Sequence, residues 1–193
     1  MLFVIAGPSG IGKSYLMQQL IARYPGEFAA PKLYTTRQPR QSEQAIDRKF
    51  ISQVSFGELQ CQGKFGFVGE FVGNWYAFAE DDIASETKHV LINAWPAMLP
   101  VLAQRPEVVI IGMTTSSAGR ELLAHRIRAR GDAPEVFSQR MQRIDIDLAD
   151  LAEHADLVSE HGKMFVIQDD SMVDTILSWI CDNYLTKVGV THD

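Results

Sequence analysis

Residues 7–14 have the types and the spacing of a loop that binds phosphate groups. They read GPSGIGKS and match the pattern G-x-x-x-x-G-K-[ST] in full. Glycines in such a loop let backbone N–H groups turn toward an anion, and a helix that starts at its end adds the positive end of its dipole. We therefore expect this loop to hold the phosphates of a nucleotide. The residues expected to do so are Gly7, Ser9, Gly10, Ile11, Gly12, Lys13 and Ser14.

Two side chains of this loop carry chemistry. The Lys13 ammonium is expected to bridge the β- and γ-phosphates of the nucleotide. The Ser14 hydroxyl is placed to bind Mg²⁺, which makes Ser14 the expected metal ligand. The metal would neutralise charge that otherwise repels an incoming nucleophile.

A second group of candidate phosphate ligands follows about twenty residues after the loop. Arg37 and Arg40 lie three residues apart in the segment TTRQPR at 35–40. Each guanidinium can bind a phosphate through two parallel hydrogen bonds, so the pair predicts a second phosphate on a second substrate. A solvated loop with two surface arginines is the alternative that this segment alone leaves open.

The apolar pattern places these residues on alternating strands and helices. Residues 2–6 form a short apolar run typical of a strand buried on both faces, and apolar residues recur at helical spacing from Lys13 to a stop at 24–26. This alternation predicts an α/β fold of three layers, α/β/α, with a parallel central sheet. Further strands are expected over 90–93, 108–113 and 164–167, and helices over about 116–130, 134–152 and 171–184.

Two segments depart from the alternation. Residues 63–78 are rich in Gly and Phe and read as short antiparallel strands in a small insert beside the main sheet. Residues 125–143 carry several arginines and read as two helical arms hinged at Gly131. No repeat or linker divides the chain, so we expect one domain. Its parts are a core of 1–32, 88–124 and 146–193, an insert of 33–87 and a lid of 125–145.

Composition excludes several classes of protein. A chain of 193 residues with 46% hydrophobic and 22% charged residues is typical of a folded globular domain. Its net charge of −6 provides no global positive field for nucleic acid or an anionic membrane, so phosphate sites must be local. Cys61 and Cys181 are too sparse for a disulfide framework or a zinc site, and no apolar run is long enough to span a bilayer. We expect a soluble, cytoplasmic protein with neither nucleic acid nor membrane as a partner.

Taken together, the motifs resemble those of the guanylate kinase family, in the same order and over nearly the whole chain. After the loop and the segment 35–40 come Glu43 and Asp47, then GNWY at 73–76, then RIRARG at 126–131 with Arg140. The resemblance implies a P-loop NTPase fold in which the loop binds ATP with Mg²⁺. It also implies an insert that binds a nucleoside monophosphate, and a lid whose arginines close over the transferred phosphoryl group.

The resemblance further implies roles for individual residues. The catalytic set would be Lys13, Arg126, Arg130 and Arg140, because positive charge around the transferred oxygens supplies most of the acceleration in phosphoryl transfer. The expected function is ATP-dependent transfer of a γ-phosphoryl group to a small-molecule phosphate monoester such as GMP. The expected acceptor-binding residues are Thr36, Arg37, Arg40, Glu70, Tyr76 and Asn93, with Glu70 readable also as a solvated strand carboxylate.

The expected base pocket departs from the family pattern. Where guanylate kinases read guanine with acidic and hydroxyl side chains, this chain offers Phe67, Phe78 and Asn93 or a neighbour. Phenyl rings stack on a base but do not distinguish bases by hydrogen bonding. The strand end LIN at 91–93 resembles bacterial ribose 1,5-bisphosphate kinases, so both acceptors stay open. A catalytically weak nucleotide-binding or interaction module is the third alternative.

Arg48 and the tryptophans also have expected places. Arg48 stands where the family has a tyrosine, and is either an added cation near the acceptor phosphate or a plain surface arginine. The GNWY motif places Trp75 near the pocket. Trp95 and Trp179 read as packing residues.

Overall fold

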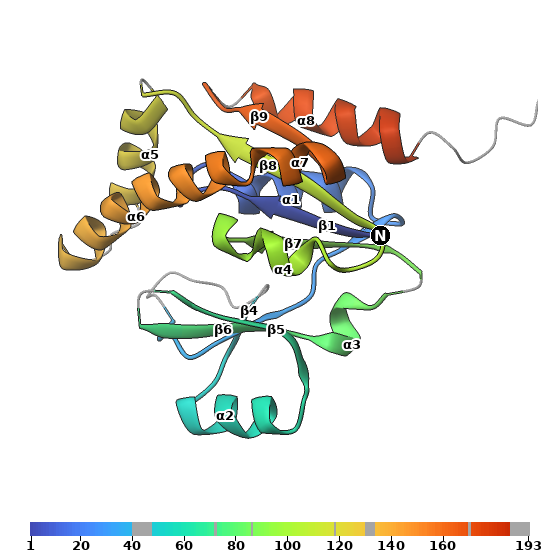
Figure 1. The fold of residues 1–193 in the computed structure, drawn as a ribbon, viewed down its shortest axis with the longest axis vertical. Helices are drawn as coiled ribbons and strands as arrows, with labels where there is room; N and C mark the ends of the chain where they lie inside the picture. Colours follow the sequence, from blue (N-terminus) through green and yellow to red (C-terminus); the bar gives the residue numbers. More distant parts are fainter. Residues whose placement is uncertain are drawn as a thin grey trace, which may run out of the picture.

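Two sheets of different size organise the chain in the computed structural model. Figure 1 shows the larger sheet between helices in the upper half of the molecule and the smaller sheet, with one helix beyond it, in the lower half. The predicted α/β fold is confirmed. The structure describes residues 1–39, 48–71, 73–85, 87–117, 119–129, 134–169 and 171–185.

The larger sheet is parallel throughout, as the alternation predicts, and its strand order is β2-β7-β1-β8-β9. Its central strand, β1, is buried at every residue. Phe3 and Ile5 point into one apolar cluster while Val4 and Ala6 point into another, which explains a continuous apolar run instead of an alternating one. The strands are β1 Leu2–Ala6, β2 Phe28–Ala29, β7 His89–Ala94, β8 Val108–Thr114 and β9 Gly162–Val166.

Helices cover both faces of this sheet. On one face, Leu16 and Leu20 of α1 and Ile176 and Ile180 of α8 share the cluster that contains Phe3. The other face is covered by α4 and α7, and the pair α5 and α6 stands at the side of the molecule (Figure 1). These helices are α1 Lys13–Arg23, α4 Leu99–Leu102, α5 Gly119–Arg128, α6 Pro134–Glu153, α7 Ala155–His161 and α8 Met172–Ile180, with a 3₁₀ turn η1 Pro96–Met98 and a π-helical turn η2 Cys181–Leu185.

The smaller sheet, with order β4-β3-β6-β5, forms the insert. The expected antiparallel strands over 63–78 are confirmed, whereas the edge pair β3 and β4 runs parallel. A helix that the apolar pattern did not indicate, α2, begins where the Ser52 hydroxyl accepts a hydrogen bond from the Ser55 N–H at 3.0 Å. The insert comprises β3 Leu33–Thr35, β4 Arg48–Phe50, α2 Gln53–Cys61, β5 Phe65–Phe71, β6 Asn74–Ala79 and α3 Glu80–Ile83.

Apolar packing fastens the insert to the larger sheet. Phe67 and Phe78 pair across β5 and β6 and are 7% and 4% exposed, in one cluster with core residues such as Ile92. A Cβ built on Gly69 of β5 would lie 2.8 Å from the Met98 Cε, so β5 lies close to η1 and a larger residue there would displace the end of the Met98 side chain. Within the ranges given above, none of the helices is long and apolar enough to cross a membrane.

Candidate functional site

The loop between β1 and α1 has the backbone that its sequence predicts. Gly10 and Gly12 have φ values of 84° and 113°, in the region that favours glycine. A Cβ on Gly7 would collide with the carbonyl oxygen of Met113 in β8. No side chain caps the start of α1, so its first N–H groups are directed to the loop rather than to a capping oxygen. This geometry fits a bound phosphate chain.

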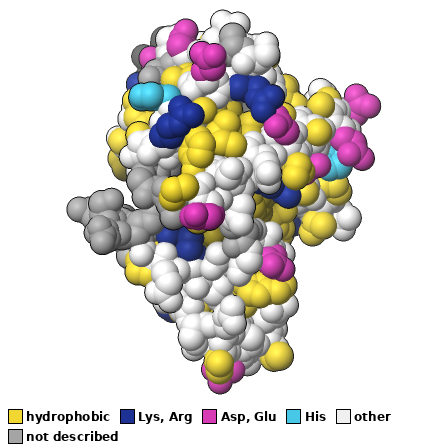
Figure 2. All heavy atoms as spheres, turned by 90° about the vertical axis from the view of Figure 1, so that its left-hand side faces the viewer, with side chains coloured by type: hydrophobic (Ala, Val, Ile, Leu, Met, Phe, Trp, Pro, Cys, Tyr) yellow, Lys and Arg dark blue, Asp and Glu magenta, His cyan; other side chains and the backbone are white. Residues whose placement is uncertain are grey.

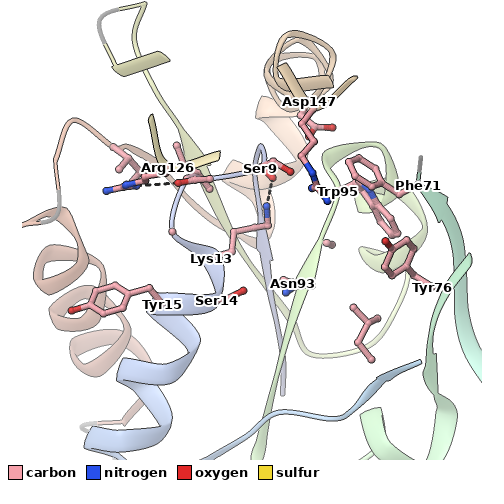
Figure 3. A pocket seen from close by; sticks show the side chains of 18 of the residues that line it. Ser9, Lys13, Ser14, Tyr15, Phe71, Tyr76, Asn93, Trp95, Arg126 and Asp147 are labelled. Atoms are coloured by element: carbon pink, nitrogen blue, oxygen red, sulfur yellow. Dashed lines mark hydrogen bonds between the residues drawn. The ribbon is translucent and has the colours of Figure 1, made fainter. Parts of the chain in front are cut away.

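Lys13 and Ser14 stand at the end of this loop. The Lys13 ammonium folds back and donates hydrogen bonds to the carbonyl oxygens of Gly7 at 2.5 Å and Pro8 at 3.0 Å (Figure 3). Ser14, in the first turn of α1, is exposed. The described residues contain no group of three His, Cys, Asp or Glu side chains that could hold a metal ion. The role of the Ser14 hydroxyl as a Mg²⁺ ligand stays a prediction.

A cleft of 670 Å³ joins the loop to the insert and to α5 and α6. This volume lies in the range of ligand-binding pockets. Figure 3 shows Lys13 and Ser9 near the middle of the cleft, with Arg126 and Tyr15 on one side and Tyr76 and Trp95 on the other. The sequence-predicted residues that line it are Gly7, Ser9, Gly10, Ile11, Gly12, Lys13, Ser14, Arg37, Tyr76, Asn93, Arg126 and Arg140.

Two acceptor-site candidates lie outside the lining of this cleft. Glu70 is exposed on β5 and borders a neighbouring hollow with Phe67 and Met98. The Thr36 hydroxyl accepts a hydrogen bond from the Trp75 backbone N–H at 3.0 Å, which ties β6 to the segment that carries Arg37. Thr36 therefore supports the segment that carries Arg37. Glu70 does not lie next to the phosphate-binding loop.

Some predicted residues lie outside the described residues. Arg40, expected on the acceptor phosphate, and Arg130, expected on the triphosphate, are among them. So are the expected hinge Gly131 and the motif residues Glu43 and Asp47. The roles given to these residues stay predictions.

The helices α5 and α6 bring cations to the loop. Arg126 of α5 donates a hydrogen bond from Nη1 to the Gly10 carbonyl oxygen at 3.0 Å (Figure 3). Arg140 of α6 lines the cleft and is 9% exposed. Figure 2 looks onto the side where α5 and α6 stand and shows Lys and Arg side chains beside hydrophobic ones on this face.

Asp147, a carboxylate of α6 that was not among the predicted residues, lines the cleft and is 2% exposed. Its Oδ1 accepts a hydrogen bond from the Arg143 Nε at 2.8 Å, one helical turn earlier. Burial raises the pKa of the Asp147 carboxyl, while the positive charges of Arg143 and Lys13 oppose that rise. The i,i+4 spacing of Arg143 and Asp147 was the available signal, but it does not reveal burial.

The insert contributes two arginines to the cleft, one that follows β3 and one on β4. Arg37 follows β3, and its guanidinium lies over the Phe50 ring at 5.3 Å from the centroid and donates to the Gln38 carbonyl oxygen at 2.7 Å. Arg48 begins β4 opposite Leu33. Both arginines line the cleft, and the role of Arg48 as an added cation near the acceptor phosphate stays a prediction.

Aromatic side chains line the same cleft, and of these Tyr76 was expected there whereas Phe71 and Trp95 were not. Trp95, expected to be a packing residue, lines the cleft with Phe71 and Tyr76. Trp75, expected near the pocket, is 39% exposed and packs on Phe56 at 6.2 Å between ring centroids. Phe67 and Phe78 also lie outside the lining of the cleft, because both are buried between insert and core.

The parallel sheet, the glycine loop with its lysine and the facing arginines define a P-loop phosphotransferase. Comparison with known proteins narrows this class. The guanylate kinase family model matches residues 1–176. A guanylate kinase of Trichormus variabilis is 35% identical over 148 residues, covering 74% of this chain and 73% of that protein, and one of Idiomarina loihiensis is 31% identical over 155 residues, covering 77% and 73%. The chain therefore belongs to the guanylate kinase family, a family of nucleoside monophosphate kinase-type phosphotransferases.

A solved structure supports the same fold. The guanylate kinase of Anaplasma phagocytophilum superposes with a TM-score of 0.68 at 18% sequence identity, covering 97% of this chain and 87% of that one. At this identity the likeness concerns the fold alone. The family match and the curated relatives favour guanylate kinase-type activity over the two alternatives, a ribose 1,5-bisphosphate kinase and an interaction module.

Proposed function

We propose that this protein transfers the γ-phosphoryl group of ATP to the phosphate of a nucleoside monophosphate, with GMP as the first acceptor to test. The observation that carries the proposal is that Lys13 of the loop and Arg37 and Arg48 of the insert line one cleft. Two anion-binding groups on opposite sides of one cleft are what transfer between two phosphates requires. The curated relatives are guanylate kinases, which makes GMP the acceptor of choice.

The loop and Ser14 account for the donor. Backbone N–H groups around Gly10 and Gly12 would hold the β-phosphate, and Lys13 would exchange its carbonyl partners for phosphate oxygens. Ser14 would hold Mg²⁺, which supplies charge neutralisation at the β- and γ-phosphates when bound.

The remaining cations act on the transferred group. Arg37 and Arg48, with Arg40, would hold the acceptor phosphate so that one of its oxygens faces the γ-phosphorus. As that oxygen forms its bond to the γ-phosphorus, the bond between the γ-phosphorus and the β–γ bridging oxygen breaks. The products, ADP and the nucleoside diphosphate, then leave. Arg126 and Arg140 stand where they would stabilise the charge on the equatorial oxygens.

The division of labour follows the elements. We assign donor binding to the core (1–32, 88–124 and 146–193), acceptor binding to the insert (33–87) and coverage of the transferred group to the lid (125–145).

Sparse cysteines that carry no disulfide fit the reducing cytoplasm as the compartment.

A direct assay tests this function. The purified chain is incubated with ATP, Mg²⁺ and GMP, and ADP and GDP are separated by chromatography. We expect equal amounts of both products, and loss of both when EDTA removes Mg²⁺. ATP consumption without a phosphorylated acceptor, or no consumption at all, contradicts the proposal.

A further inference from the structure

The acceptor half of the cleft has a continuous aromatic wall made of Phe71, Tyr76 and Trp95. The ring centroids of Tyr76 and Trp95 are 5.5 Å apart, and those of Phe71 and Trp95 are 5.6 Å apart. The residues come from β5, β6 and the end of β7, and Figure 3 shows them together on one side of the cleft. All three are partly exposed to the cleft that they line.

Packing fixes the position of this wall. A Cβ built on Gly69 would lie 3.1 Å from Trp95 Cζ3 and 2.8 Å from Met98 Cε. The backbone of β5 therefore packs against Trp95 with no side chain between them. On its outer side, the Phe71 ring is covered by the Arg143 guanidinium at 5.8 Å from the centroid. The rings are therefore held as a preformed surface.

The described residues next to the wall offer few groups that could identify a base. Leu33 and Ala94 add aliphatic surface, and Asn93 adds one amide, which offers both a donor and an acceptor and can pair with different base edges.

The carboxylates that line the described part of the cleft are engaged elsewhere. Asp147 accepts from the Arg143 Nε on its own helix. Asp169, which follows β9 at the far edge of the larger sheet, accepts from the N–H and the hydroxyl of Ser171 at 2.8 and 2.5 Å. Discrimination between bases by large factors requires buried hydrogen-bonding groups that the wrong base leaves unpaired. The polar atoms of the wall are the Tyr76 hydroxyl, which both donates and accepts, and the Trp95 N–H, and both side chains are partly exposed rather than buried.

We propose that this site accepts nucleoside monophosphates with weak discrimination between bases, because the base stacks on the aromatic wall while Arg37 and Arg48 bind the phosphate. Aromatic stacking tolerates any base, since every base presents a flat π-face. The inference rests on the proposed function and deepens it by naming how the acceptor is selected.

Acceptor competition tests the inference. Initial rates of ADP formation are measured at fixed ATP with GMP, AMP, CMP and UMP, and with ribose 5-phosphate as the acceptor without a base. We expect kcat/KM values within about tenfold for the four nucleotides and at least about tenfold lower for ribose 5-phosphate.

The outcomes separate the inference from the function beneath it. A spread of more than tenfold between nucleotides overturns weak discrimination while leaving the phosphotransferase intact. A kcat/KM for ribose 5-phosphate that equals those of the nucleotides overturns the stacking role. Absence of turnover with every acceptor means that the proposed function itself has failed.

A matched set of tryptophan variants tests the wall. Trp95→Leu removes a ring from the cleft, and we expect it to raise KM by about tenfold for all four nucleotides, leaving KM for ATP and the rate with ribose 5-phosphate unchanged. Trp75→Leu makes the same change on the exposed side of the insert and should leave every constant unchanged. Trp95→Phe keeps an aromatic ring and should restore KM to within about threefold of the original.

Thermal melting of each variant separates binding from folding. If KM for ATP rises as much as KM for the nucleoside monophosphates in both Trp95 variants, Trp95 has a structural role and the stacking proposal is overturned. An unchanged KM for the nucleotides in a folded Trp95→Leu variant overturns it as well.

Discussion

The two halves of the cleft are built in different ways. The donor half consists of eight consecutive residues, 7–14, between a buried strand and the helix that follows it. The half that we assign to the acceptor is assembled from side chains on or next to β3, β4, β5, β6 and β7, which are spread over residues 33–95. The first depends on backbone geometry that a short pattern encodes, and the second depends on tertiary packing. A single contiguous motif therefore predicts the half that we assign to the donor, whereas the half that we assign to the acceptor is predicted only in part, with Arg37, Tyr76 and Asn93 expected and Phe71 and Trp95 not.

The largest expected effect falls on the donor half. Lys13→Met keeps the length of the side chain but removes the charge that we assign to the β- and γ-phosphates. We expect kcat to fall by about 10²–10³-fold with the melting temperature little changed. Steady-state kinetics and circular dichroism check this. A variant that keeps more than a tenth of the activity breaks the assignment of the loop as the reacting end.

A smaller, one-sided effect is expected in the acceptor half. Arg37→Ala removes a guanidinium next to the acceptor phosphate, and KM for GMP should rise by about 10–100-fold while KM for ATP stays the same. Lys49→Ala is the matched control, because Lys49 lies on the neighbouring strand over the Tyr34 ring and outside the cleft lining. If KM for ATP rises with KM for GMP, the two halves are not separable.

A stability measurement tests whether the backbone of the loop at Gly7 lies as close to β8 as the structure shows. Gly7→Ala places a Cβ against the Met113 carbonyl oxygen of β8, and the free energy of unfolding should fall by about 1–3 kcal/mol. Gly26→Ala, with no atom within 4 Å of its Cβ, should change stability far less. Urea denaturation of both variants measures the difference. Equal stabilities contradict the close approach of the loop to β8.

The smallest effect is a pH dependence at the junction of the halves. Burial raises the pKa of Asp147, so its ionised form destabilises the folded protein at neutral pH, and the folded state takes up the proton first as the pH falls. Relative to Asp147→Asn, which does not titrate, wild-type stability should therefore increase between neutral pH and pH 4. Thermal melting at both pH values checks the sign. A relative decrease on acidification means that the ion pair with Arg143 dominates.

The strands of the larger sheet were predictable from sequence because burial on both faces leaves a continuous apolar run, as at residues 2–6. The loop was predictable because its residues are contiguous. Trp95 was misassigned as a packing residue, since an aromatic that follows a buried strand looks the same in sequence whether it faces a core or a cleft. Phe67 and Phe78 were placed near the base because they stand where the family has its guanine-reading residues, whereas the fold buries both rings.

Helix α2 and the carboxylate of Asp147 had weaker signals. The short α2 has little amphipathic pattern, and its start depends on the Ser52 hydroxyl. In the sequence, Asp147 resembles an ordinary solvated charge on a helix. The structure instead buries it on α6.

The shared burial of Phe67 and Phe78 limits how substrates can enter. Swinging the smaller sheet away from the larger one would expose both rings to water, at about 1.5–3 kcal/mol for each. The shared burial therefore opposes opening the cleft by a rigid movement of the insert. Apolar packing also holds α5 and α6, because Leu123 and Ile127 of α5 and Ile144 of α6 are buried in the cluster that contains Phe3.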